Sequence, residues 1–120
     1  MKKLTKSVYF SQGEKEESNS GFILREKDAV FVDTAFSLEK TRKDKEYFEK
    51  EIDKPVKYLV NTHFHSDHTF GNQFFNCDII AGYDTPVLMQ GYLEKLSSWL
   101  KTEKDPQVVK VLRDVKLTYP

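Results

Sequence analysis

A histidine-rich segment placed directly after a predicted strand limits the folds open to this chain. All three histidines fall within residues 61–68, which read NTHFHSDH and also contain Asp67. The residues just before, 56–60, are mostly β-branched or aromatic and predict a strand that ends where the histidines begin. Imidazole and carboxylate groups are ligands that zinc accepts. The segment therefore predicts a metal site at a strand end, and the alternative is a polar loop whose histidines lie in water.

The spacing within this segment predicts two pairs of ligands. Side chains two residues apart point the same way in extended backbone, so His63 and His65 can face one ion. Asp67 and His68 are neighbours and diverge unless the backbone turns. Residues 69–72 provide turn chemistry, with Gly71 free to adopt a positive φ. A turn there would let the second pair face a second ion beside the first.

Residues 62–71, THFHSDHTFG, resemble the T-H-x-H-x-D-H-x-x-G signature of the metallo-β-lactamase superfamily. The resemblance implies a zinc-dependent hydrolase, in which metal-activated hydroxide attacks an ester, thioester, amide or lactam of a small-molecule substrate. It implies two zinc sites in the complete domain, with His63 and His65 at one site. Asp67 and His68 belong to the other site. Asp67 is then also the catalytic residue, which orients the nucleophile or handles a proton.

A strand, a helix and a second strand precede the histidines and are expected to form a parallel unit. Residues 29–32 are a short apolar run that predicts a strand buried on both faces, and Ser37 can cap a helix that runs to about Lys50. Asp33 and His63 then lie at the carboxyl ends of parallel strands, where open α/β sheets bind ligands. The family resemblance makes Asp33 a supporting residue that orients a metal-bound imidazole. The alternative is a turn or helix-cap aspartate.

The resemblance covers one half of the family's domain. We expect an α/β fold, half of a metallo-β-lactamase-type αβ/βα sandwich, with a mixed β-sheet and helices packed on one face. Residues 1–120 are then the amino-terminal half, and the carboxyl-terminal half is absent. No histidine follows His68, and residues 116–120 are strand-like and suggest an interrupted domain. Four ligands fall short of what two zinc ions need.

The absence of the carboxyl-terminal half affects the expected activity of the chain and its expected protein partners. The parent domain is expected to be a hydrolase, while the 120-residue chain is expected to be inactive alone, with doubtful zinc occupancy. The alternative is a non-catalytic, metal-binding or partner-dependent half-domain. A half sandwich also exposes an apolar sheet face. We therefore expect a homodimer, or a complementing second half, to cover that face.

Composition excludes several classes of partner. Nineteen basic and nineteen acidic residues give a formal net charge of zero, which argues against binding to nucleic acid or to an anionic membrane. Cys77 is the only cysteine, and we interpret it as a small core residue rather than a metal ligand. A lone thiol and the lack of an apolar stretch of signal-peptide length predict a cytoplasmic protein.

The remaining segments predict a hairpin and a helical region. Strands near residues 8–10 and 21–24 are joined by a polar loop over residues 13–20. A helix is expected to start near Asp84 and to be weakened or kinked at Gly91, and a further helix starts at Pro106. Trp99 recurs at helical spacing and is interpreted as core rather than as a substrate contact.

Overall fold

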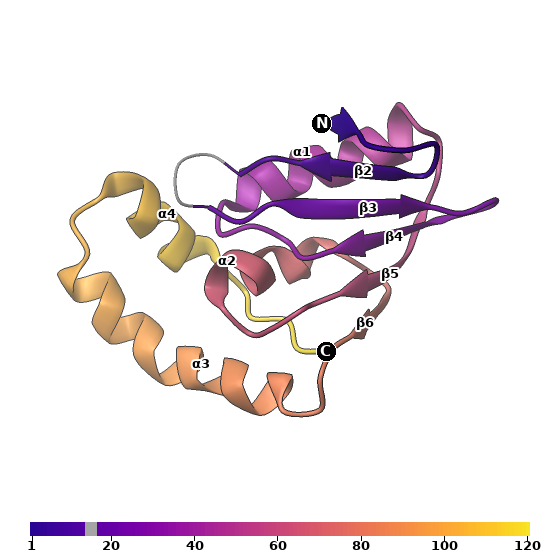
Figure 1. Ribbon diagram of the computed structural model, residues 1–120. Helices are drawn as coiled ribbons and strands as arrows, with labels where there is room; N and C mark the ends of the chain where they lie inside the picture. The colour runs from indigo at the N-terminus through magenta and orange to yellow at the C-terminus, as the bar shows by residue number, and fades with distance from the viewer. Residues whose placement is uncertain (14–16) are drawn as a thin grey trace.

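The central element of the fold is a mixed β-sheet (Figure 1). The computed structural model describes residues 1–13 and 17–120. Within these residues the sheet has six strands in the order β1-β2-β3-β4-β5-β6. Neighbours from β1 to β4 pair antiparallel, whereas β4, β5 and β6 run parallel. The strands are β1 (Lys2–Lys3), β2 (Val8–Ser11), β3 (Ser20–Leu24), β4 (Ala29–Val32), β5 (Val56–Val60) and β6 (Asp78–Ile80).

The helices complete the α/β fold that the sequence predicts. In Figure 1, α1 runs behind β2 and β3, while α3 and α4 form an arm beside the sheet. The bounds are α1 (Leu38–Lys50), α2 (Ser66–Thr69), the 3-10 helix η1 (Phe70–Phe74), α3 (Thr85–Thr102) and α4 (Pro106–Asp114). Both predicted helical starts in the carboxyl third are confirmed, and α3 runs through Gly91 without interruption.

The unit β4-α1-β5 carries the site residues to one edge of the sheet. The Ser37 side chain accepts a hydrogen bond from the backbone N–H of Lys40 at 3.2 Å, so α1 begins as predicted. β4 and β5 are parallel, with Val32 paired to Val60. The segments that leave these two strands therefore emerge at the same edge, at Asp33 after β4 and at Asn61 after β5.

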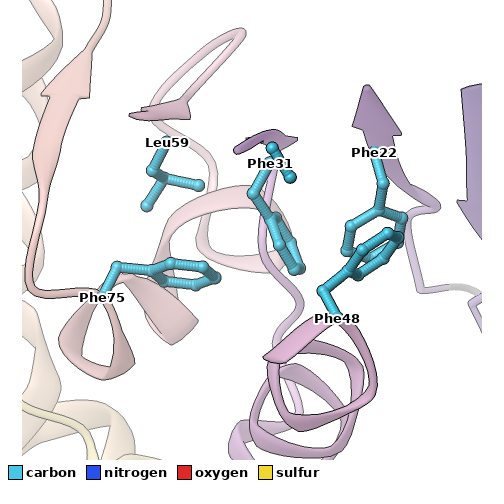
Figure 2. Close-up of a cluster of buried hydrophobic side chains, with 6 residues drawn as sticks. Phe22, Phe31, Phe48, Leu59 and Phe75 are labelled. Atoms are coloured by element: carbon cyan, nitrogen blue, oxygen red, sulfur yellow. The ribbon is translucent and has the colours of Figure 1, made fainter. Parts of the chain in front are cut away.

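Aromatic side chains fill the space between the sheet and α1. Figure 2 shows Phe22 and Phe31 pointing from their strands toward Phe48 of α1 and toward Phe75. The rings of Phe22 and Phe48 stack with centroids 4.3 Å apart, and Phe31 meets Phe75 at 4.6 Å. This cluster buries one face of the sheet. A second cluster joins α3 and α4 to Phe70 near the histidine segment.

Strand β4 departs from the sequence prediction. Ala29 and Phe31 are buried, whereas Val30 and Val32 are only half-buried, so the strand is covered on one face and not on both. The continuous apolar run predicts a strand between two layers. Within the described residues, only the α1 side of the sheet has a hydrophobic cluster packed on it, which explains the difference.

Two further predictions concern loops and the chain end. The strand-like residues 116–120 form no strand, although the carbonyl of Thr118 accepts a hydrogen bond from Asn72 Nδ2 at 3.1 Å. The antiparallel pairing of β2 with β3 is confirmed. The loop predicted between them includes residues 14–16, which lie outside the described residues.

Candidate metal centre

The structure gathers the three histidines at the carboxyl edge of the parallel strands. His63 follows β5, His65 precedes the first residue of α2, and His68 lies within that helix. The ring centroids of His63 and His65 are 4.6 Å apart, and those of His63 and His68 are 4.0 Å apart. The short helix α2 supplies the change of direction that the sequence required after His65. It also brings the Asp67 carboxylate to 3.6 Å from Nε2 of His68.

Asp33 connects the end of β4 to the histidine segment. Its Oδ1 accepts a hydrogen bond from the Thr62 backbone N–H at 2.8 Å, and its Oδ2 accepts one from the Thr62 hydroxyl at 2.6 Å. Oδ2 also lies 2.8 Å from Nδ1 of His68. An ionised carboxylate only accepts, so this contact assigns the proton of His68 to Nδ1 and leaves Nε2 free to bind a metal. Asp33 is not the helix cap of the alternative interpretation, because Ser37 caps α1.

The backbone of Asp33 takes an unusual conformation. Its φ is 58°, in the left-handed region that aspartate and asparagine tolerate better than most residues. The side chain is almost fully buried, with 7% of its surface exposed. This turn conformation places the carboxylate between Thr62 and His68. The aspartate therefore serves the turn and the histidine segment together.

A buried polar network holds the main chain of the site. The carbonyl oxygen of His68 accepts hydrogen bonds from the Thr34 backbone N–H at 3.0 Å, the Thr34 hydroxyl at 3.1 Å and Asn61 Nδ2 at 3.2 Å. The side-chain amides of Asn61 and Asn72 also bond to each other, at 2.8 and 3.1 Å. All three residues are at most 2% exposed. Sequence reasoning gave Asn72 only a turn role and gave Thr34 and Asn61 none, because polar residues beside a turn are usually solvated.

Tyr92 of α3 reaches the same segment from outside the sheet. Its hydroxyl oxygen accepts a hydrogen bond from the backbone N–H of Ser66, the first residue of α2, at 3.0 Å. Its ring meets Phe70 edge-on with centroids 5.3 Å apart. The ring of Tyr92 packs against the second hydrophobic cluster. The hydroxyl contact could not be inferred from helical spacing.

Gly71 is required for a reason other than the predicted one. The described glycines include none with a positive φ, so Gly71 does not use that freedom. A Cβ atom at this position would instead lie 2.3 Å from Thr41 Oγ1 and 2.7 Å from Thr41 Cβ. Glycine therefore lets η1 approach α1 closely. This approach brings the backbone after the histidines against the helix.

The electrostatics of the cluster favour neutral imidazole at His63. Burial lowers the pKa of His63, and the neighbouring rings of His68 and His65 lower that pKa further, while Asp33 and Asp67 oppose the shift. The Thr62 hydroxyl lies 2.9 Å from Nδ1 of His63, which leaves its Nε2 available. Neutral nitrogens are the form that binds metals.

The ligand atoms do not yet surround a common point. Within residues 1–13 and 17–120, no three His, Cys, Asp or Glu side chains are grouped as a metal ion would require. His65 is exposed and the Asp67 side chain is 35% exposed, so both have room to rotate. The donor types and the free nitrogens suit zinc. Convergence would need these rotations or ligands from a further segment.

Two residues considered as alternatives take structural positions. Cys77 directly precedes β6 and packs against the cluster of Phe22 and Phe31, and burial raises the pKa of its thiol. Trp99 packs against the second cluster, and its indole N–H donates a hydrogen bond to Glu103 at 2.9 Å. The interpretation of Cys77 and Trp99 as core residues fits these contacts.

The fold and the site together define an α/β protein with a histidine and aspartate cluster at the carboxyl edge of its parallel strands. A sequence model described as the metallo-beta-lactamase superfamily matches residues 13–76, more than half of the chain. The chain therefore belongs to the metallo-β-lactamase superfamily. The matched span contains Asp33 and the whole of residues 61–68.

Solved structures share this fold. A metallo-β-lactamase from Hirschia baltica is 25% identical with a TM-score of 0.68, and the match covers 74% of this chain and 45% of that one. The metallo-β-lactamase FIM-1 from Pseudomonas aeruginosa, solved in its mono-zinc form, is 21% identical with a TM-score of 0.65, covering 75% of this chain and 44% of that one. This second likeness supports the fold alone.

A curated relative matches a shorter stretch. The linear primary-alkylsulfatase of Pseudomonas sp. (strain ATCC 19151) is 46% identical over 46 residues, which are 38% of this chain and 9% of the relative. The chain thus spans less than half the length of each of these relatives. None of the helices in the described part of the chain has the length and apolar character needed to cross a bilayer.

Proposed function

We propose that this chain carries the zinc-binding half of a metallo-hydrolase domain and needs a further segment or chain for turnover. His63 and His65 would hold one zinc ion, and Asp67 and His68 the other. The observation that carries the proposal is the contact between Asp33 and Nδ1 of His68, because it presents the opposite nitrogen of that ring as a ligand. Residues 1–120 are, in this proposal, the amino-terminal half of the domain.

The chemistry of the site supports hydrolysis. Bound zinc supplies Lewis acidity and makes a water molecule a competent nucleophile near neutral pH. Asp33 fixes the tautomer and orientation of His68. The Asp67 carboxylate is partly exposed beside His68, where it can orient the nucleophile or accept its proton. Thr34 and Asn61 donate hydrogen bonds to the carbonyl oxygen of His68 and hold its main chain in place.

The number of ligands supports inactivity of the chain alone. A catalytic zinc typically has three protein ligands and an open position for water. Two ions that share four ligands do not reach this number. We therefore expect weak zinc binding and no turnover from the isolated chain. The second candidate function is a non-catalytic half-domain. It would have the same metal site, but the segment or chain that completes it would not make it a hydrolase.

Zinc titration tests the proposal directly. Isothermal titration should show weak zinc binding by the wild-type chain, and a His63→Ala, His65→Ala double variant should lose the ion that this pair holds. Cobalt substitution gives a spectroscopic measure of the ligand number. Lys43→Ala, an exposed change on α1, is the matched control. Equal zinc binding by wild type and the double variant would overturn the assignment.

Substrate assays test the expected inactivity of the isolated chain. A panel should contain a β-lactam, a thioester, a carboxylic ester and a primary alkyl sulfate, the last because the alkylsulfatase resembles part of this chain. Hydrolysis by the zinc-loaded chain alone would contradict the expected inactivity and show that the four ligands suffice. The proposal places the protein in the cytoplasm, which is supported by its single cysteine.

A further inference from the structure

The hydroxyl of Thr62 lies between a carboxylate and an imidazole and has one proton to donate. Its Oγ1 is 2.6 Å from Oδ2 of Asp33 and 2.9 Å from Nδ1 of His63. The shorter contact is to a charged acceptor, which attracts the proton more strongly than a neutral ring nitrogen does. The hydroxyl oxygen then accepts from His63, so the proton of this ring lies on Nδ1 and its Nε2 is free.

Both carboxylate oxygens of Asp33 hold Thr62 in place. Oδ1 accepts from the backbone N–H of Thr62 at 2.8 Å, while Oδ2 accepts from its hydroxyl. Threonine is branched at Cβ and has few χ1 rotamers, so two contacts to one carboxylate are enough to select one of them. The hydroxyl is therefore held at a fixed place beside the ring of His63.

The same oxygen of Asp33 also serves His68. Oδ2 lies 2.8 Å from Nδ1 of His68, so the four groups form a hydrogen-bonded chain in the order His63, Thr62, Asp33, His68. Each proton in this chain points toward Asp33, and both rings keep an unprotonated Nε2. The described residues provide no hydrogen bond to the ring of His65, which lies outside the chain.

We propose that Thr62 is a positioning residue through which Asp33 sets the tautomer of His63 as well as that of His68. The inference rests on the proposed function, in which these two histidines bind different zinc ions. One carboxylate then prepares a ligand of each ion, directly at His68 and through Thr62 at His63. The two zinc sites are therefore linked by hydrogen bonds before any metal binds.

The order of the protons gives this chain a specific response to Asp33→Asn. The amide oxygen still accepts from the Thr62 backbone N–H, and the two hydrogens of the NH₂ group point to the Thr62 hydroxyl and to His68 Nδ1. The Thr62 proton is then free to turn toward Nδ1 of His63, which has to accept it. Both histidines should change to the tautomer with the proton on Nε2, although only His68 touches residue 33.

Nitrogen-15 spectra of the metal-free chain test this response. They report the tautomer of each histidine under alkaline conditions, where imidazole is neutral. Wild type should have Nδ1–H at His63 and His68, and Asp33→Asn should change both. In a Thr62→Val background, Asp33→Asn should change His68 alone, because the connection to His63 is lost. His65 is the internal reference and should stay the same in every variant.

Metal binding tests the consequence for the site. Thr62→Val should weaken zinc binding by about 10- to 100-fold, as the loss of a supporting partner of a ligand does, whereas Thr62→Ser keeps the hydroxyl and should retain wild-type affinity. Thr102→Val is the matched control, since Thr102 is also exposed and its hydroxyl donates to backbone carbonyls of α3. Circular dichroism checks that each variant folds, and the Asp33→Asn spectra decide the matter even if Thr62→Val does not.

The two measurements fail in different ways. A wild-type His63 with its proton on Nε2, or a His63 tautomer that Asp33→Asn leaves unchanged, would overturn the proposal. The expected tautomers together with equal zinc affinity in wild type and Thr62→Val would support the hydrogen-bonded chain and count against His63 as a zinc ligand.

Discussion

Replacing Asp33 by asparagine removes charge and acceptor capacity while keeping the shape of the side chain. The amide oxygen can still accept from the Thr62 backbone N–H, but the NH₂ group faces His68 Nδ1 and the Thr62 hydroxyl, two donors in the wild-type chain. Hydrogen bonds to charged groups contribute about 1.5–3 kcal/mol each, and the Thr62 hydroxyl can turn to accept, so we expect a loss of about 2–4 kcal/mol in the free energy of unfolding. Urea unfolding of the metal-free chain measures this loss.

The same substitution should weaken zinc binding. His68 must now accept at Nδ1, so its proton moves to Nε2, the nitrogen proposed to bind zinc. Loss of such a supporting partner typically costs about 10- to 100-fold in metal affinity. Chelator competition measures the zinc affinity of wild type and variant.

Asp53→Asn is a closely matched control for the backbone. Asp53 has the same φ of 58° as Asp33, yet it is exposed and precedes β5, whereas the histidines follow the other end of that strand. This variant should keep wild-type stability and zinc affinity. If Asp33→Asn also kept both, the carboxylate would have no part in holding His68, and the reasoning from the three hydrogen bonds would be wrong.

Two further substitutions probe how neighbouring elements hold the histidine segment. Gly71→Ala places a methyl group 2.3 Å from Thr41 Oγ1 and should destabilise the chain by about 1–3 kcal/mol. Gly91→Ala adds a methyl group in open space and should stabilise α3 by about 0.5–1 kcal/mol. Thermal unfolding of both variants measures these opposite changes. Tyr92→Phe removes the hydroxyl that accepts from the Ser66 backbone N–H and should lower the free energy of unfolding by about 1 kcal/mol and also lower zinc affinity. The control Tyr83→Phe, at a 97% exposed position, should change neither.

The sequence predicts the fold of β4-α1-β5 well because its signals are local. Ser37 caps α1, a short apolar run and a β-branched, aromatic run mark the two strands, and the strand-helix-strand order predicts parallel pairing. The prediction for β4 was wrong on burial because a continuous apolar run has the same appearance whether one layer or two cover it. Whether one or both faces of β4 are covered depends on the segments that pack against the sheet, and a local sequence pattern does not show those segments.

The site was predicted from residue types, and its geometry could be predicted only in part. Motif spacing brought the three histidines together correctly, while their role as metal ligands stays a prediction. The contacts of Asn61, Asn72 and Tyr92 join segments far apart in sequence, so spacing could not reveal them. Gly71 shows the same limit, since the close approach of Thr41 depends on how α1 lies against η1.

The strand ends that carry the candidate metal site also border the side of the sheet that lies away from α1. The histidine segment is fixed from the α1 side of the sheet, through Thr34, Asn61 and the approach of η1 to α1. His65 is exposed, Asp67 is half-buried and does not converge with it on one point, and Val30 and Val32 are also half-buried. A segment or chain that covers the side of the sheet away from α1 would lie beside the same strand ends and should restrict the site edge. Zinc affinity should therefore be higher in the completed domain than in the isolated chain, and an equal affinity in both would show that the covering of the sheet and the metal site are independent.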